Sequence, residues 1–315
     1  QYEFLTYDLN LNALTIQPGH WYVDKYLILP ENMSLTIPKG TTLDFSSRAG
    51  LIATGPVHIT GTSDEPVILK GNTASNKWQG IAVLNSKKLS VWSNVKIENT
   101  TGVEIGSWVL TGGINFYQAD VQMDHVVLAG NKCEDALNIV RSNFKLDFVT
   151  IKNASSDAFD SDFSTGTVQS GVFENIGNGG GGDGIDVSGS KVTVSGTRFK
   201  NISDKALSVG EKSVLHADGV SIEKVGIGAA SKDGSTLTII NTKISEAHIA
   251  ALLAYIKKPE YGPGTILAQN LEMVFVTSKA VSQTGSKILI DDVEVKTKDI
   301  DVKKLYSATK QPVTK

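Results

Sequence analysis

The sequence predicts an all-β protein: a single-stranded right-handed parallel β-helix (solenoid) with coils of about 22 residues and an N-terminal cap. Three observations predict this fold. A short phrase, in which a small residue is followed by alternating apolar and polar residues, recurs at a nearly constant interval. Further short stretches rich in β-branched residues lie between its copies, which is the periodicity of strands. Gly, Asn, Ser and Asp separate these stretches, which is typical of turns.

The interval between copies indicates a solenoid. Copies begin at residues 80, 113, 136, 158, 184, 206, 228 and 251, and the last seven are separated by 23, 22, 26, 22, 22 and 23 residues. Three short strands per interval make one coil, which cannot bury its inner face alone but does so when coils stack at about 4.8 Å. A leucine-rich repeat needs a Leu/Asn signature that this chain lacks, and a propeller blade needs about 40 residues. An Ig-like sandwich would not keep so regular a period.

The first coils carry a resemblance to a known superfamily. Residues 21–45 are expected to form strand, turn and strand, with breaks at Pro30 and Pro38, and residues 50–71 complete early coils before the sequence WQGIAVL at 78–84. This layout resembles the opening coils of right-handed β-helix proteins of the pectate-lyase-like superfamily, and the resemblance runs from about residue 20 to 295. That superfamily holds lyases, hydrolases, epimerases, tailspikes and adhesins, so the fold leaves the function open. One structural domain is expected, with a cap and first coil at 1–45, the β-helix at 46–295 and a C-terminal tail or cap at 296–315.

The composition excludes several classes of partner. The formal net charge of −3 offers no basic excess for nucleic acid. No run of 18 apolar residues is present, so no membrane span is expected. A single cysteine, Cys133, excludes an intrachain disulfide. The chain opens without Met, which indicates either a processed chain or a segment of a longer surface chain, and we expect an extracytoplasmic location.

Alternation along the repeated phrase assigns its residues to two faces. In the copy at 184–188, Ile185 and Val187 point inward, while Asp186 and Ser188 point outward. Stacking the copies predicts two outward columns on one sheet. The first column contains Ala82, Asn115, Asn138, Asp160, Asp186, Ser208, Ala230 and Leu253. The second column contains Leu84, Tyr117, Val140, Asp162, Ser188, Gly210, Lys232 and Tyr255.

Three aspartates at the centre of these columns are the candidate catalytic residues. Asp160 and Asp186 fall on adjacent coils, about 5 Å apart, and Asp162 lies about 7 Å along the strand from Asp160. The alternative interpretation is a solvated polar face. A further column at the preceding turn contains Asp135, Asp157, Asp183 and Lys205. We expect these aspartates to accept backbone N–H bonds in the turn, with Lys205 paired to Asp183.

Two kinds of carbohydrate chemistry suit such a site. Glycoside hydrolysis needs two carboxyl groups, about 5 Å apart for retention and about 6.5–9.5 Å apart for inversion. Elimination from a uronic acid, or its epimerisation, needs a base and a cation that neutralises the sugar carboxylate. The β-helix hydrolases acting on polygalacturonate are similar in having an aspartate trio, but their adjacent Asp-Asp pair, Gly-His-Gly and Arg-Ile-Lys motifs are missing here. β-Helix lyases typically use a Lys or Arg side chain together with Ca²⁺. The candidates for that basic side chain are Arg141, Lys205 and Lys232. The chemistry requires no cofactor. Ca²⁺ is a candidate ion, with oxygen ligands from Asp160 and Asp186 and from their neighbours Asn138 and Asp162.

Residues around the aspartates are candidates for binding the polysaccharide. Loop insertions at 104–113, 177–183 and 256–264 are expected to overhang this sheet and form the walls of a groove. Exposed aromatic side chains beside a polar groove suit stacking on sugar rings. The candidate substrate-binding residues are Asn138, Arg141, Lys232, Tyr117, Tyr255 and Trp108, with Tyr261 as a further aromatic candidate.

Two function hypotheses follow. The first is a carbohydrate-active enzyme that cleaves or epimerises a polysaccharide, as a lyase, a glycoside hydrolase or an epimerase, at Asp160, Asp162 and Asp186. It predicts a groove and at least one carboxyl group with a raised pKa. The second is a non-catalytic module of a surface or secreted protein, used for adhesion or polysaccharide binding. It predicts a flat, hydrated face with all three aspartates exposed.

Overall fold

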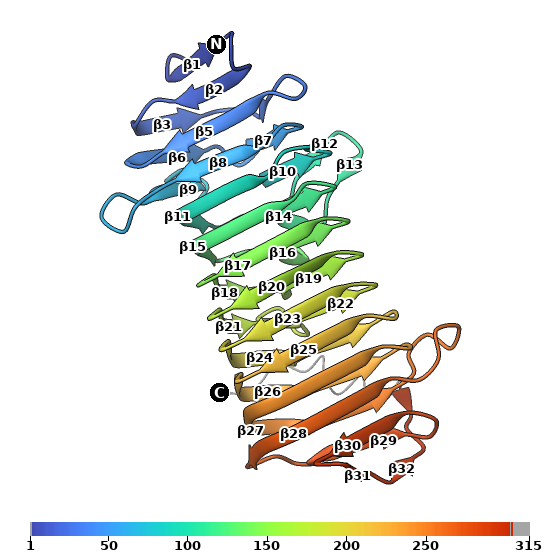
Figure 1. Cartoon of the computed structure of the whole chain (residues 1–315). Helices are drawn as coiled ribbons and strands as arrows, with labels where there is room; N and C mark the ends of the chain where they lie inside the picture. The colour runs from blue at the N-terminus through green and yellow to red at the C-terminus, as the bar shows by residue number, and fades with distance from the viewer. Residues whose placement is uncertain (1, 303, 305–315) are drawn as a thin grey trace. The chain divides into compact units, whose positions relative to one another are not determined.

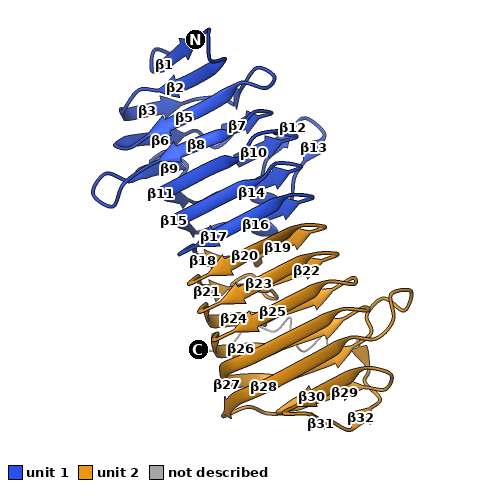
Figure 2. Ribbon diagram, viewed as in Figure 1, with its two compact units in different colours: residues 1–152 blue, residues 153–315 orange. Residues whose placement is uncertain are grey.

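The computed structural model describes residues 2–302 and 304 (Figure 1). It divides into two compact units, Gln1–Lys152 and Asn153–Lys315, each described by itself below and called unit 1 and unit 2 (Figure 2). Both units consist of stacked coils of short parallel strands, at about 23 residues per turn. The predicted parallel β-helix is confirmed. Among the described residues, none belongs to a helix long and apolar enough to cross a membrane.

Unit 1 begins with an antiparallel pair, β1 (Leu5–Asp8) and β2 (Ala13–Ile16), and then winds into coils. We call the sheet that carries the repeated phrase the site sheet. In unit 1 the site sheet contains β4 (Leu27–Ile28), β7 (Gly50–Ala53), β10 (Gly80–Leu84), β14 (Gly112–Tyr117) and β16 (Asp135–Val140). The other strands are β3 (Gly19–Val23), β5 (Ser34–Pro38), β6 (Thr41–Phe45), β8 (Val57–Thr60), β9 (Val67–Gly71), β11 (Ser90–Glu98), β15 (Val121–Ala129) and β17 (Asn143–Asp147), with a hairpin of β12 (Glu104–Ile105) and β13 (Trp108–Val109). β18 (Thr150–Ala154) spans the boundary between the units.

Unit 2 repeats the pattern with longer strands that bend from one sheet into the next. Its site sheet contains β19 (Asp157–Asp162), β22 (Ile185–Ser188), the last parts of β24 (Arg198–Gly210), β26 (Ser221–Lys232) and β27 (Thr236–Tyr255), then β29 (Ala280–Gln283) and β32 (Thr297–Lys298). The remaining strands are β20 (Thr165–Gln169), β21 (Val172–Ile176), β23 (Lys191–Ser195), β25 (Val214–Asp218), β28 (Thr265–Val274), β30 (Lys287–Ile290) and β31 (Val293–Glu294). Among the described residues of this unit, the strands pair in parallel, whereas β30 pairs with β31 in the antiparallel sense.

The register of the site sheet follows the predicted columns. In unit 1, Ala82 pairs with Asn115 and Asn115 with Asn138. In unit 2 the first column runs through Asp160, Asp186, Ser208, Ala230 and Leu253, in that order. The predicted inward residues, including Phe159, Ser161, Ile185 and Val187, are 0% exposed. The period-2 alternation of the sequence therefore assigns the inner face correctly.

A ladder of buried serines holds the turn that follows the site sheet in unit 2. The backbone N–H of Ser164 donates to Oγ of Ser190 at 2.9 Å, that of Ser190 to Ser213 at 3.0 Å, and that of Ser213 to Ser235 at 3.0 Å. These serines are at most 4% exposed. Each turn N–H donates to the hydroxyl of the next coil, and the N–H of Ser213 also donates to the carbonyl of Gly210 at 3.1 Å, so these buried groups are satisfied.

The outward face of the site sheet is only partly exposed. In unit 2, Ala230, Leu253 and Tyr255 form an apolar cluster with Ile227, against which Ile300 and Val302 pack. In unit 1, Ile52, Ala82 and Val103 form a second cluster, which Ile105 and Leu110 of the 104–113 insertion help to cover. Chain segments beyond the coil thus fold over the apolar parts of the outward columns.

Candidate functional site

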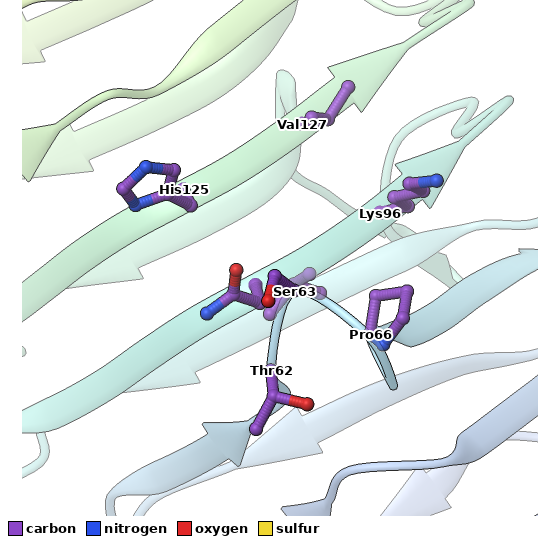
Figure 3. Close-up of a pocket in the computed structure, with 8 residues that line it drawn as sticks. Thr62, Ser63, Pro66, Lys96, His125 and Val127 are labelled. Atoms are coloured by element: carbon purple, nitrogen blue, oxygen red, sulfur yellow. The ribbon is translucent and has the colours of Figure 1, made fainter.

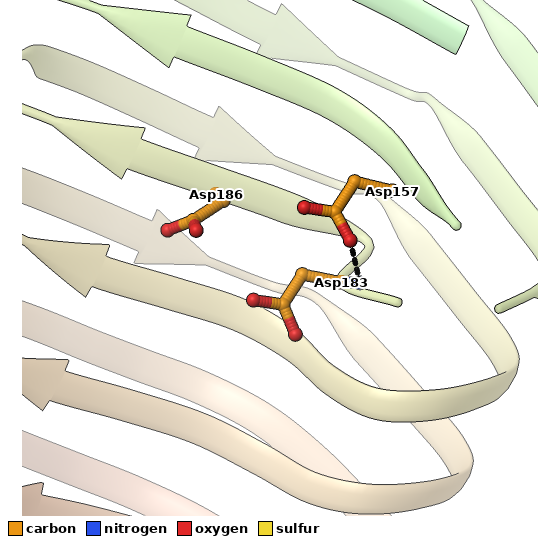
Figure 4. A group of neighbouring side chains, drawn as sticks. All are labelled: Asp157, Asp183 and Asp186. Carbon is orange, nitrogen blue, oxygen red and sulfur yellow. Dashed lines mark hydrogen bonds between the residues drawn. The ribbon is translucent and has the colours of Figure 1, made fainter. Parts of the chain in front are cut away.

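The polar part of the site sheet in unit 2 brings three carboxyl groups together. Oxygen atoms of Asp157, Asp183 and Asp186 lie within 4.8 Å of one another (Figure 4). Asp183 stands at the turn before β22, and Asp186 is the second residue of that strand. Although Asp183 is in the turn and Asp186 in the strand, their carboxyl groups lie on the same, outward side of the sheet.

The turn aspartates stack as predicted. Oδ1 of Asp157 accepts a bond from the backbone N–H of Asp183 at 2.8 Å, and Oδ1 of Asp183 accepts one from the N–H of Lys205 at 2.9 Å. Each aspartate therefore closes the turn of the next coil. In unit 1, Oδ2 of Asp135 accepts a bond from the side-chain amide of Asn138 at 3.0 Å.

Lys205 is buried among these carboxyl groups. Its side chain is 3% exposed, and Nζ lies 3.2 Å from Oδ1 of Asp183 and 2.6 Å from Oδ2 of Asp204. The predicted ion pair between Lys205 and Asp183 is confirmed, and Asp204 is a second carboxylate partner. A buried ammonium group needs such partners because desolvation of a lone charge is costly.

Lys232 forms a second buried contact from β26, two strands away from Asp186. Its Nζ donates to Oγ of Ser208 at 2.7 Å and lies 3.5 Å from Oδ1 of Asp186. The side chain of Lys232 is 6% exposed, whereas that of Asp186 is 24% exposed. Asp186 is therefore the member of this ion pair that a ligand can reach, and Lys232 is its buried partner.

The two carboxyl groups of β22 and its turn have opposite pKa shifts. Burial is the largest influence on Asp183 and raises its pKa to about 6, against the opposing charge of Lys205. Burial also acts to raise the pKa of Asp186, but the ammonium groups of Lys232 and Lys205 outweigh it and hold that pKa below its usual value. Below about pH 6 Asp183 therefore favours its protonated form, while the lowered pKa of Asp186 favours its ionised form. A protonated acid beside an ionised carboxylate is the pairing that acid–base catalysis uses.

The predicted catalytic trio is brought partly together. Asp160 pairs in register with Asp186 on the adjacent strand, and Asp162 pairs with Ser188. All three aspartates are half-buried on one face of one sheet, so they do not point to different sheets. The sequence interpretation favoured turn capping for Asp183 over a metal or substrate role, and its carboxyl group is also part of the cluster. The repeated Asp-x-x-Asp spacing at 157–160 and 183–186 is the signal that could have revealed this.

The Asp157–Asp183–Asp186 cluster is not built as an all-carboxylate metal site. Ca²⁺ takes 6–8 oxygen ligands, and Oδ1 of both Asp157 and Asp183 already accepts a backbone N–H. The ammonium groups of Lys205 and Lys232 already lie 3.2 Å from Oδ1 of Asp183 and 3.5 Å from Oδ1 of Asp186. Ca²⁺ binding by Asp160 and Asp186 stays a prediction.

Of the predicted substrate-binding residues, Lys232 and Tyr255 lie in unit 2. Tyr255 was expected to be an exposed aromatic, and this is wrong. Its ring is 0% exposed because Tyr255 belongs to the apolar cluster that Ile300 and Val302 help to cover. The same covering makes Leu253 and Ala230 buried although their register is outward.

The other four predicted binding residues lie in unit 1. Trp108 is exposed on the hairpin of the 104–113 insertion. Nη1 of Arg141 donates to Oη of Tyr117 at 2.7 Å, so these two side chains form one surface. Asn138 is 8% exposed, and its amide donates to Oγ1 of Thr111 and to Asp135. Asn138 therefore anchors the insertion as well as facing outward.

The two remaining insertions are anchored to the coils of unit 2. In the glycine-rich loop, the N–H of Gly179 donates to the carbonyl of Ser155, and a Cβ at Gly182 would lie 2.6 Å from the Cα of Gly177. Its glycines therefore serve close backbone packing. In the 256–264 insertion, the N–H groups of Lys257 and Lys258 both donate to Oδ1 of Asp233.

A small pocket in unit 1 lies between loop 62–66 and strands β11 and β15, with Lys96 and His125 in its lining (Figure 3). Its volume is about 110 Å³, whereas ligand pockets usually measure about 300–1,000 Å³. None of its lining residues is a predicted site residue. We assign this pocket no role in binding a sugar.

Comparison with known proteins supports the fold. No protein-family model matches the chain, and no curated protein matches it. Among solved structures, the Agl-KA catalytic domain aligns at a TM-score of 0.51 with 12% identity, over 88% of this chain and 62% of that one. The tailspike of Acinetobacter phage vb_AbaP_AS12 aligns at 0.47 with 10% identity, over 87% of this chain and 58% of that one. A mutant of the periplasmic alginate epimerase AlgG aligns at 0.46 with 10% identity, over 88% and 80%.

At these identities the likeness is one of fold, and this chain spans less than two thirds of the first two structures. Register, coil length and structural alignment agree. The chain has a parallel β-helix fold like that of the Agl-KA catalytic domain.

Proposed function

We propose that this protein is a carbohydrate-active enzyme that cleaves a polysaccharide on the outward face of unit 2, centred on Asp186. The observation that carries the proposal is a pair of neighbouring carboxyl groups, Asp183 and Asp186, whose pKa values are shifted in opposite directions. Their oxygens approach within 4.8 Å, which matches the closer of the two separations that glycoside hydrolysis uses, about 5–5.5 Å for retention.

In this proposal Asp186 acts as the ionised carboxylate that meets the sugar at the scissile bond. Its partial exposure makes it the reachable member of the pair, and Lys232 keeps it ionised. Asp183 holds a proton up to about pH 6 because it is buried. Proton transfer to the leaving oxygen then comes from Asp183 or, one coil away, from Asp160. Asp162 lies at the edge of the same face and is placed to bind a sugar hydroxyl.

Charge arrangement adds support for an enzyme over a passive binding face. A hydrated, structureless surface would leave its carboxyl groups close to their ordinary pKa values. Here burial raises the pKa of Asp183, whereas the buried lysines Lys232 and Lys205 hold the pKa of Asp186 below its usual value. Perturbed groups of this kind concentrate at catalytic sites, although structural ion pairs also produce them.

A panel of acidic and neutral polysaccharides tests the proposal, with product read as reducing ends and as absorbance of an unsaturated sugar, with and without Ca²⁺. Reducing ends without absorbance indicate hydrolysis, and both together indicate elimination. We expect Asp186→Asn to lower kcat/KM by about 10²–10⁴-fold, the usual contribution of an acid–base group. Asp160→Asn and Asp162→Asn test the two neighbours.

Asp292→Asn is the matched control, because Asp292 is an exposed aspartate in the same unit and has a left-handed backbone that Asn tolerates. Its activity should stay within about twofold of wild type, as for most exposed substitutions. If product forms and Asp186→Asn equals wild type, the site is wrong. If wild type binds a polysaccharide without forming product, the protein is a binding module. If it neither binds nor cuts any member, the carbohydrate assignment fails.

A further inference from the structure

Phe163 is an exposed aromatic residue at the end of the aspartate-bearing strand. It follows Asp162 directly and is 56% exposed. Its φ of 50° lies in the left-handed region, which bulky residues rarely adopt. Phe148 and Phe275 share this backbone geometry and are also exposed, so what distinguishes Phe163 is its position directly after Asp162 on the polar face.

The turn fixes the position of this residue. The backbone N–H of Phe163 donates to the carbonyl of Ser188 at 2.8 Å, and the next residue, Ser164, enters the buried serine ladder. Both bonds attach the turn to the neighbouring coil. The ring is therefore presented at a defined place on the surface.

The next coil is shaped to receive the ring. The position equivalent to Phe163 there is Gly189, where a Cβ would lie 2.6 Å from Cδ1 and 2.8 Å from Cε1 of Phe163. The ring thus lies directly over the Cα of Gly189, which has no side chain to displace it. This contact covers one part of the ring and leaves more than half of the residue exposed to solvent.

The ring is close to the proposed catalytic face. Phe163 is three residues along the chain from Asp160, which at strand spacing is about 10 Å. Its supporting glycine follows Ser188 on β22, the strand that carries Asp186 (Figure 1). A sugar chain bound across Asp160 and Asp186 would extend over this end of the sheet.

We propose that Phe163 is a stacking platform for a pyranose ring of the polysaccharide, adjacent to the sugar held at Asp186. The inference rests on the proposed function and adds a residue that sets binding and positioning. An aromatic face beside carboxylates suits a sugar, because the ring packs on the C–H face while the carboxylates accept hydroxyl bonds. A purely apolar partner would leave those carboxylates desolvated without a donor.

Two variants remove or displace the ring. Phe163→Asn deletes it and places in the turn a residue that tolerates the left-handed conformation. Gly189→Ala keeps the phenyl group but puts a methyl group where the ring lies. Gly219→Ala is the control for the second change, since Gly219 has the same φ of 61° and no atom within 4 Å of an added Cβ. Phe275→Asn is the control for the first, because Phe275 is 85% exposed with a φ of 55°.

Binding and turnover are measured separately on alginate, polygalacturonate and an α-glucan, by affinity gel electrophoresis and by product formation. For the polysaccharide that wild type binds, Phe163→Asn and Gly189→Ala should each weaken binding by about tenfold, which corresponds to 1.4 kcal/mol. Gly219→Ala and Phe275→Asn should bind like wild type, and Phe163→Trp should restore binding. Thermal melts confirm that each variant is folded.

The outcomes separate this inference from the proposed function. If wild type binds without turnover and Phe163→Asn loses binding, the platform stands and the catalytic assignment fails. If wild type cuts a polysaccharide and both ring variants bind and cut equally well, the platform is wrong and the enzyme stands. If wild type binds no probe, both are wrong.

Discussion

Two lysine side chains in this protein are buried, where the desolvation of a charged group costs free energy. Lys205 and Lys232 are nearly fully buried, and each is matched to carboxylates that the coil places beside it. Asp183 then has two structural contacts, with the backbone and the side chain of Lys205, besides its proposed chemical role. A residue can thus belong to the turn architecture and to the site at once.

Replacing Lys205 with Met tests how much its ion pairs contribute to the free energy of unfolding. Removing the ammonium group leaves Asp183 and Asp204 buried without their shared cation, and we expect the free energy of unfolding to fall by about 3–5 kcal/mol. Urea denaturation measures it. Lys200→Met, which breaks the half-exposed pair with Glu223, is the control and should cost under about 1 kcal/mol. Equal losses in the two variants would contradict the assignment of Lys205 as the buried charge of the network.

The opposite pKa shifts predict the pH dependence of turnover. Asp183 keeps its proton below about pH 6 and loses it above, while Asp186 ionises below its usual range. If Asp183 supplies the proton, kcat/KM should fall about tenfold per pH unit above pH 6 and should decline again only at low pH. A neutral substrate and melting curves at each pH serve as controls. A flat profile from pH 5 to 8 would remove Asp183 from the mechanism.

At the scale of elements, the turns are hydrogen-bonded from coil to coil, as the strands are. The serine ladder and the aspartate ladder satisfy turn N–H groups on both sides of the site sheet. Because each bond joins one coil to the next, the turns fix the stacking of β19, β22 and β24, and so the separation of the carboxyl groups that they carry.

Ser190→Ala tests the ladder. The hydroxyl of Ser190 accepts from the N–H of Ser164, and the substitution removes that acceptor from a buried turn. We expect a loss of about 1–3 kcal/mol in the free energy of unfolding. Thr193→Ala, at an exposed position on the adjacent strand, is the control. A loss no larger than that of the control would mean that another group satisfies the turn.

At the scale of the whole molecule, the outward face of unit 2 changes character along the coils. It is carboxylate-rich at β19 and β22, and apolar at β26 and β27, where Ile300 and Val302 pack on it. The predicted tail at 296–315 is described only through residue 302 and at 304. Its described part packs on the apolar cluster at β26 and β27.

Ile300→Asp should weaken that covering. A charged group against the Tyr255 cluster is expected to lower the free energy of unfolding by about 1–3 kcal/mol and to increase binding of a hydrophobic dye. Val293→Asp changes a valine that is 70% exposed and should have little effect on either readout. If both variants melt alike and bind dye alike, Ile300 contributes nothing to the face.

Much of this architecture could be read from local pattern. The columns through Ala82 and Asn115, and through Asp160, Asp186 and Ser208, have the expected register. The burial of Tyr255 could not be predicted, because the residues that cover it lie about 45 positions away in the chain, outside the repeat. The prediction of Asp183 as a turn residue was correct but incomplete, since sequence alternation says nothing about how a turn side chain leans.

The sequence by itself determined the coil, its period, its inner face and the sheet on which the aspartates gather. Those properties depend on alternation and on short turn signals, which are local. Only the tertiary structure decided which outward residues stay accessible to solvent. It also decided that Lys205 and Lys232 are buried beside Asp183 and Asp186, and that these two aspartates have opposite pKa shifts. Burial and charge depend on what the folded chain brings near from other coils, so no single stretch of sequence contains them.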